Sequence, residues 1–256
     1  MVKAVLLVGG FSGQMRPLTL TQPLPLLDFC NAELIMHQLK ALKDAGASEV
    51  VICYNERQVP PLWNASILRF EAELELKLTT LQEKVSHGTA GAIKHAEALI
   101  TDGGSNEAPF LVVNGDVLCT YPLRDLVHHH QQKQCEGTVL ITRSETPSEY
   151  GVVVTDERTG RIRHFVQEPE TFVSELINAG VYIFSPSIFD RLSLRPTSME
   201  KEVLPALAAE EQLYSMPLDG YWMNIKTPKN FLHGTSHYLS HLRLHQPQTL
   251  AQESIA

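Results

Sequence analysis

Short apolar runs alternate with stretches of helical periodicity through the first half of the chain. Turn residues bound the apolar runs, which predict β-strands at residues 4–8, 50–53, 76–81 and 110–113. Between the strands, apolar positions at helical spacing predict a helix that Asn31 caps and Gly46 ends, and further helices over 60–74 and 89–100. This alternation is typical of a mostly parallel sheet covered by helices on both faces.

The pattern changes after Gly137, where β segments follow one another without helices between them. We expect these segments to form a subregion inserted into or appended to the first sheet, rather than an independent domain. They lie at residues 138–142, 150–155, 162–166 and 177–184.

The last clear element is an amphipathic helix predicted over residues 228–244. Its apolar face is expected to consist of Phe231, Leu232, Tyr238, Leu239 and Leu242. Such a stripe normally packs on a core, and the alternative is a surface that a partner covers. We therefore expect one domain over 1–245, followed by a polar, frayed tail over 246–256.

Composition narrows the class of protein. With 256 residues and 43% hydrophobic content, the chain can bury a full core. A net charge of −8 argues against nucleic acid as a partner, and no apolar run approaches the ~20 residues of a membrane helix. The four cysteines are widely separated and the N-terminus has no signal-peptide layout, so we expect a cytosolic protein with reduced thiols.

A glycine-rich turn follows the first predicted strand and reads V-G-G-F-S-G-Q-M-R-P-L-T at residues 8–19. Glycines let backbone N–H groups approach an anion closely, because no Cβ stands in the way. In sheets of this class, ligands lie beyond the carboxyl ends of the strands, which is where this loop falls. The loop therefore predicts a phosphate-binding site.

The loop and six later motifs resemble those of the sugar-1-phosphate nucleotidyltransferases, in particular the catalytic domain of the beta-type mannose-1-phosphate guanylyltransferases (GDP-mannose pyrophosphorylases). The family loop reads G-G-x-G-T-R-L-R-P-L-T and continues to P-K-P-L, where this chain has P-L-P-L at 23–26. The other motifs keep the family's order and spacing over essentially all of residues 1–245. They are L-L-D-F-C-N at 26–31, G-T-A-G at 88–91, N-G-D-V at 114–117, Y-G-V-V at 150–153, I-N-A-G at 177–180 and S-M-E-K-E-V at 198–203.

The resemblance implies an α/β fold, a Rossmann-like nucleotidyltransferase mixed sheet flanked by helices. It implies the conversion of GTP and mannose 1-phosphate into GDP-mannose and pyrophosphate, with Mg²⁺ as cofactor. Family members usually carry a C-terminal left-handed β-helix of hexapeptide repeats. This sequence reaches Ala256 without such a repeat, so we expect a fold that lacks the β-helix.

The resemblance also assigns candidate site residues. Phosphate-neutralising cations of the family correspond to Gln14 and Leu24, and the second metal ligand, in the motif W-x-D-I-G, corresponds to Asn224. The remaining assignments are Asp116 for the metal; Gly9, Gly10, Arg16, Gly88, Thr89 and Ala90 for the nucleotide; and Gly151, Gln167, Glu168 and Asn178 for the sugar.

Several of these positions depart from the family's chemistry. The arginine and lysine of the loop are replaced by Gln14 and Leu24, and the family's Glu-Lys-Pro reads Gln167-Glu168-Pro169. Asn224 keeps an oxygen but lacks the carboxylate charge that Mg²⁺ prefers. On balance these substitutions make a polyanion-binding pocket more negative, which predicts impaired catalysis.

Three functions are compatible with this sequence. The first is an impaired guanylyltransferase-like protein that binds GTP or GDP-mannose, regulates an active pyrophosphorylase by association, or does both. The second is an active guanylyltransferase that tolerates the substitutions, and the third is a scaffold without a ligand. The retained fold motifs and the altered chemical residues favour the first.

Individual residues have simpler alternatives. Asp116 is also compatible with an ordinary turn at a strand end, and Arg16 with a structural salt bridge instead of a phosphate contact. Three consecutive histidines, 128–130, point to different sides of a helix and favour a solvated helix end over a metal site. Cys119, close to Asp116, is expected to be a small buried residue rather than a nucleophile.

Overall fold

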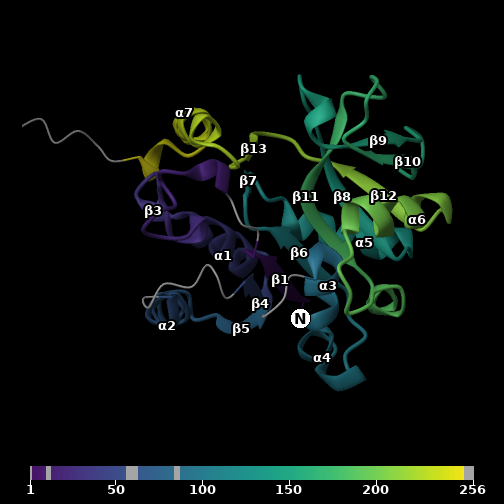
Figure 1. Cartoon of the computed structure of the whole chain (residues 1–256), viewed down its shortest axis with the longest axis horizontal. Coiled ribbons are helices and arrows are strands. Elements are labelled where there is room, and N and C mark those ends of the chain that lie inside the picture. Colours follow the sequence, from purple (N-terminus) through teal and green to yellow (C-terminus); the bar gives the residue numbers. More distant parts are fainter. Residues whose placement is uncertain (1, 10–12, 56–62, 84–86, 251–256) are drawn as a thin grey trace, which may run out of the picture.

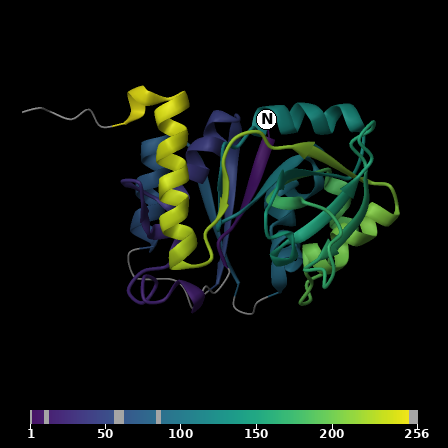
Figure 2. The ribbon, with the colours of Figure 1, turned by 90° about the horizontal axis from the view of Figure 1, so that it is seen from above.

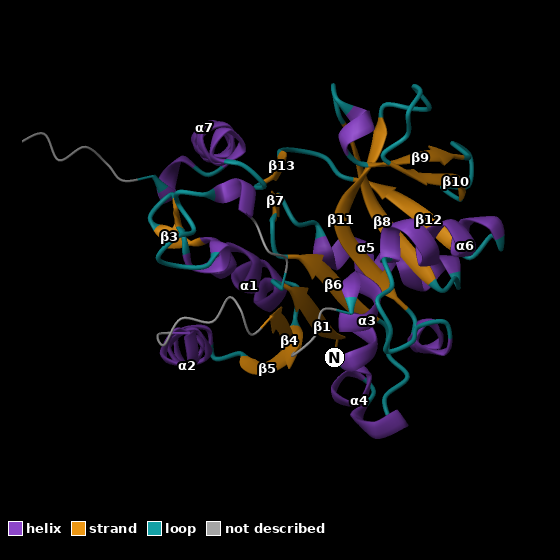
Figure 3. Ribbon diagram, in the orientation of Figure 1, coloured by secondary structure: helices purple, strands orange, loops and turns teal. Residues whose placement is uncertain are grey.

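The computed structural model describes residues 2–9, 13–55, 63–83 and 87–250. A nine-stranded mixed sheet forms its centre, with strands in the order β10-β9-β11-β6-β1-β4-β5 and with β8 and β12 joined beside β11 (Figures 1 and 3). The strands run over β1 Val2–Leu7, β4 Ala47–Asn55, β5 Lys77–Glu83, β6 Phe110–Asn114, β8 Gly137–Arg143, β9 Gly151–Thr155, β10 Ile162–Gln167, β11 Leu176–Phe184 and β12 Leu213–Pro217.

The first four strands of this sheet are parallel, as their spacing predicts. β1 pairs in parallel with β4 and β6, and β4 pairs in parallel with β5. The later strands then extend the same sheet, because β11 pairs antiparallel with β6, β8 and β9. The predicted mixed α/β fold is confirmed.

Alternating strand residues divide the core into two layers, one on each face of the sheet. In β1, Ala4 and Leu6 belong to the layer that includes helices α1, α2 and α5, whereas Val5 belongs to the layer that includes α3, α4 and α6. Figure 2 shows the helices on both sides of the strands. These helices run over α1 Leu34–Asp44, α2 Trp63–Leu74, α3 Gly88–His95, α4 Glu97–Ile100, α5 Leu123–Lys133 and α6 Leu204–Ala209.

A third, smaller apolar cluster lies under helix α7 (Pro228–His245). Phe29 is its centre, with Phe231 edge-on at 5.4 Å and Tyr238 at 5.7 Å between ring centroids. Two short ribbons adjoin this cluster: β2 (Asp28–Phe29) with β3 (Ala32–Glu33), and β7 (Val117–Cys119) with β13 (Trp222–Asn224). None of the helices in the described part of the chain combines the length and apolarity needed to span a bilayer.

Three local predictions are wrong. Asn31 has a φ of +66° in the turn between β2 and β3, so the first helix begins at Leu34 and Glu33 takes the cap position. The helix expected over 89–100 is divided at Ala96 into α3 and α4.

The third concerns the apolar face of α7, which is not one surface. Phe231 and Tyr238 pack on the third cluster and Leu242 is buried, but Leu232 is 70% exposed and Leu239 is 42% exposed. A single-turn 3-10 helix (Pro247–Thr249) follows α7, and the rest of the predicted tail, from 251 on, lies outside the described residues.

Candidate functional site

The candidate site lies where β6 ends and the chain turns into the β7–β13 ribbon. Gly115 follows β6, and its backbone amide donates to the carbonyl of Leu7 in β1 over 2.8 Å. Asp116 comes next, and its carbonyl accepts a 2.6 Å hydrogen bond from the amide of Ile225. Because β7 and β13 pair antiparallel with Asn224 opposite Val117, residues 224–226 run alongside Asp116. The structure thus brings together Asp116 and Asn224, the two positions that the sequence assigned to a metal.

The side-chain amide of Asn224 lies beside the carboxyl group of Asp116 and favours its charged form. Burial raises the pKa of the Asp116 carboxyl, whereas the ammonium of Lys226 and the Asn224 amide both lower it. Asn224 is 7% exposed, and its Oδ1 has no hydrogen-bond partner within the described part of the chain.

Lys226 is a site residue that sequence reasoning missed. Its Nζ lies 6.0 Å from the centroid of the Tyr150 ring, and its charge acts on Asp116. The sequence contained a signal for it, because Lys226 stands at the position of the glycine in the family's W-x-D-I-G motif. The lysine offsets part of the positive charge lost at the other positions.

Two of the sugar-side candidates, Gly151 and Gln167, lie opposite each other in the β9–β10 pair. A Cβ on Gly151 would stand 2.6 Å from Cζ of Phe165 and 2.9 Å from Oε1 of Gln167, so this site admits only glycine without rearrangement. Gln167 Oε1 is buried without a hydrogen-bond partner among the residues described. Glu168 is exposed, with a φ of +48°, and its amide donates to the Tyr150 carbonyl over 2.9 Å.

Asn178, the fourth sugar-side candidate, is engaged within the protein. Its Nδ2 donates to the hydroxyl of Tyr182 over 2.7 Å, and its Oδ1 accepts from the amide of Gly180 over 2.9 Å. Gly180 has a φ of +73° and approaches Asn114, whose Oδ1 is another buried acceptor without a partner in the described structure. Asn178 therefore stabilises the backbone of β11 at this point. Its side-chain amide can still form further hydrogen bonds.

The motif that begins at Gly88 forms the first turn of α3. Thr89 donates its hydroxyl to Oε2 of Glu200 and accepts from the amide of Met199, both within 2.9 Å. The amide of Ala90 donates to the carbonyl of Thr197 over 3.1 Å. These contacts join the motif to the segment 197–200, so the hydroxyl of Thr89 serves the fold in this structure.

The loop candidates separate into three groups. Gly9 lies at the carboxyl end of β1 against the backbone of Asn55, and Gly10 lies outside the described residues. Gln14 and Arg16 are exposed, and Arg16 has an interaction partner. Leu24 packs against the third apolar cluster, so at the position of the family's lysine this chain has a packing residue.

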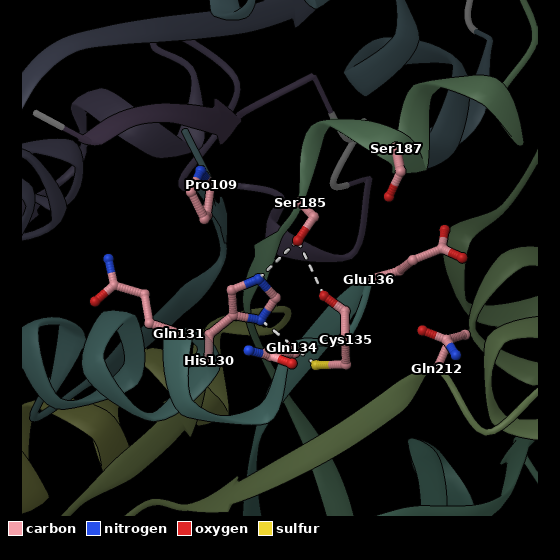
Figure 4. A pocket seen from close by; sticks show the side chains of 9 residues that line it. All are labelled: Pro109, His130, Gln131, Gln134, Cys135, Glu136, Ser185, Ser187 and Gln212. Atoms are coloured by element: carbon pink, nitrogen blue, oxygen red, sulfur yellow. Dashed lines mark hydrogen bonds between the residues drawn. The ribbon is translucent and has the colours of Figure 1, made fainter. Parts of the chain in front are cut away.

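The histidines at 128–130 are far from this site, and the prediction of a solvated helix end is wrong for His130. His130 is 2% exposed, and Figure 4 shows its ring near Ser185 and Cys135. Ser185 directly follows β11, and Cys135 lies just before β8. The hydroxyl of Ser185 donates to the carbonyl of Cys135, so it accepts from Nε2 of His130 at 3.1 Å. Nδ1 of His130 then accepts from the hydroxyl of Thr138 at 2.9 Å.

Burial lowers the pKa of His130 to about 4, so its ring is neutral at physiological pH. The pocket beside His130 includes Pro109, which precedes β6, whereas Asp116 follows β6. The two sites therefore lie at opposite ends of that strand. Within the described ranges, no group of three or more His, Cys, Asp or Glu side chains could hold a metal ion. Cys119 is buried, as predicted.

The parallel strands, the glycine loop and the Asp116 turn are the parts of a nucleotide-handling α/β transferase. The chain matches the Nucleotidyl transferase family over residues 3–241, and it belongs to that family. It is 45% identical over 250 residues to the mannose-1-phosphate guanylyltransferase catalytic subunit beta of Dictyostelium discoideum, covering 98% of this chain and 68% of that protein. It is similarly 45% identical to the Danio rerio catalytic subunit beta, over 97% of this chain and 68% of that one.

Solved structures agree on the fold. A UDP-glucose pyrophosphorylase complexed with UDP-glucose superposes with a TM-score of 0.76 at 21% identity, covering 94% of this chain and 99% of that one. An apo UDP-glucose pyrophosphorylase gives a TM-score of 0.75 at 22% identity, covering 94% and 99%. At these identities the likeness establishes the architecture.

Proposed function

We propose that this chain binds a GDP-sugar of the GDP-mannose type beside Asp116, with little or no turnover, and that the liganded protein regulates an active guanylyltransferase. The base and the sugar follow from the relatives, which are named mannose-1-phosphate guanylyltransferases. The retained family motifs support binding, and the replacement of the family's cationic residues argues against catalysis.

Unpaired acceptor oxygens carry the argument for binding. Oδ1 of Asn114, Oε1 of Gln167 and Oδ1 of Asn224 are buried and have no hydrogen-bond partner in the described part of the chain. Asn224 lies in β13 together with Trp222, whose ring contacts Tyr150 edge-on at 5.3 Å, and Gly151, which follows Tyr150, lies opposite Gln167. A buried acceptor left unpaired costs about 1–3 kcal/mol, so a ligand that supplies hydroxyl or N–H donors recovers that cost. A sugar nucleotide supplies both.

The argument against catalysis rests on charge and packing. Nucleotidyl transfer develops charge on phosphate oxygens, and removal of a single transition-state cation can cost roughly 10³–10⁵ in rate. Gln14 and Glu168 are exposed without positive charge, and Leu24 packs against an apolar cluster. Losses that act as a unit do not simply multiply, but the loss of one cation alone would leave little turnover.

The test measures binding and turnover on the same preparation. GDP-mannose is expected to raise the melting temperature, whereas pyrophosphate release from GTP and mannose 1-phosphate stays near background. The Dictyostelium discoideum catalytic subunit beta serves as the active control. Turnover within tenfold of that control would establish the active-enzyme alternative, and the absence of any shift with GDP-mannose, GTP or mannose 1-phosphate would favour a scaffold.

Regulation requires contact with the active enzyme. The outward leucines of α7, Leu232 and Leu239, are the apolar residues that such a contact would cover. Co-purification with a beta-type guanylyltransferase should be weakened by Leu232→Asp with Leu239→Asp. If the chain stays monomeric beside such an enzyme at tens of micromolar, which corresponds to about 6–7 kcal/mol of binding, the regulatory part is wrong.

A further inference from the structure

The ribbon of β7 and β13 places a lysine near the Asp116 turn. The hydrogen bond between Ile225 and Asp116 aligns residues 224–226 with the Asp116 turn. Lys226 follows immediately, with its ammonium 6.0 Å from the Tyr150 ring centroid and close enough to act on the Asp116 charge. A positive charge is thus built into the chain beside the one carboxylate of the 114–117 motif.

The donor set around Asp116 does not fit a resident Mg²⁺. Mg²⁺ demands octahedral coordination by hard oxygen ligands, usually with one or two carboxylates. Here Asp116 supplies one carboxylate, and Asn224 supplies a neutral amide in place of a second carboxylate. A dication would also have to approach the ammonium of Lys226, which repels it.

A lysine can supply the positive charge that a divalent cation would bring to a phosphate. Its ammonium is a compact charge with three donors on a flexible stem, and lysine is a common phosphate ligand. Its Nζ lies over the Tyr150 ring, which favours a positive charge at this position.

We propose that Lys226 replaces the divalent cation at this site, so that the chain binds the diphosphate of a sugar nucleotide without Mg²⁺. This inference rests on the proposed GDP-sugar site. The ammonium neutralises part of the diphosphate charge, and Asp116 with Asn224 positions the lysine rather than a metal.

The test is titration calorimetry of the full chain with GDP-mannose, in excess EDTA and in excess MgCl₂. The unmodified chain should give the same dissociation constant in both buffers, within about threefold. Lys226→Gln should weaken binding by about tenfold or more, the effect of losing a charged hydrogen bond, and Lys226→Arg should recover most of it. Lys229→Gln, an exposed lysine on α7, is the matched control and should leave affinity unchanged.

A double variant supplies the converse test. Asn224→Asp with Lys226→Gly, which rebuilds two carboxylates without a lysine, should bind GDP-mannose at least about tenfold more tightly with Mg²⁺ than with EDTA. If the unmodified chain binds GDP-mannose but loses at least tenfold in EDTA, the Lys226 inference is wrong and the proposed function stands. If it binds in neither buffer, the GDP-sugar proposal fails and this inference fails with it. Melting curves of each variant establish that the fold is intact.

Discussion

The backbone amide of Ile225 donates a 2.6 Å hydrogen bond to the carbonyl of Asp116, across a ribbon that joins segments more than a hundred residues apart and sets the Asn224 amide beside the Asp116 carboxyl. The buried Oδ1 of Asn224 has no hydrogen-bond partner in the described structure. An aspartate at the same position would instead face Asp116 with a second negative charge. The residue at position 224 therefore sets the charge that faces Asp116.

Replacing Asn224 by aspartate should create a weak divalent-cation site. In Asn224→Asp, two carboxylates stand together and repel each other, so the melting temperature in EDTA should fall. Mg²⁺ binding without nucleotide should become measurable by titration calorimetry, whereas the unmodified chain should show little heat of binding. Identical Mg²⁺ titrations for both proteins would mean that position 224 does not belong to a metal site.

Gly180 should be intolerant of a side chain for two separable reasons. Its φ is +73°, and a Cβ would lie 2.9 Å from Cγ2 of Val117 and 3.0 Å from Nδ2 of Asn114. Gly180→Ala should therefore lower the free energy of unfolding by about 2–3 kcal/mol in urea denaturation.

The matched control for this variant is Gly103→Ala. Gly103 has a similar φ of +69° but nothing within 4 Å of the added Cβ, so this variant should lose only the backbone contribution, about 1 kcal/mol. Equal losses in the two variants would show that contact with Asn114 and Val117 contributes nothing.

Stability should fall in acid because of His130. Its pKa is about 4 in the folded chain, below the ordinary value of about 6.5, because burial disfavours the charged ring. Between about pH 6.5 and 4 the unfolded chain binds a proton that the folded chain does not, so the free energy of unfolding decreases as pH falls, by up to about 3 kcal/mol.

Urea denaturation at pH 7.5 and pH 4.5 measures this effect. His130→Gln should be less stable than the unmodified chain at pH 7.5, since Thr138 and Ser185 lose their partner, but its stability should depend less on pH. His164→Gln, an exposed histidine on β10, should keep the full pH dependence. The same slope in all three proteins would assign the acid sensitivity to other groups.

The two sides of α7 should respond differently to truncation. Tyr238 packs against Phe29, His37 and Tyr221, so Tyr238→Ala should cost about 2–4 kcal/mol of stability. Leu232→Ala removes a side chain that is 70% exposed and should change stability by less than about 0.5 kcal/mol. Thermal unfolding of both variants checks the assignment, and comparable losses would place Leu232 in a contact that this structure does not contain.

Local pattern in the sequence determined the elements and their class. Short apolar runs and helical periodicity predicted β1, β4, β5 and β6, because side-chain alternation and helical spacing are properties of neighbouring residues. The glycine loop and the motifs that follow predicted the family, and the match over residues 3–241 confirms that prediction. The altered residues at 14, 24 and 168 were visible for the same reason, since each is a difference within one short motif.

Only the tertiary structure decided what surrounds each of these residues. His130 is buried because β8 and Ser185 close over the end of α5, and nothing in three consecutive histidines indicates this. Phe231 and Tyr238 face the core while Leu232 faces solvent, a division set by the cluster around Phe29. Lys226 lies near Asp116 because β13 pairs with β7, and strand pairing between distant segments depends on the folded sheet rather than on local periodicity.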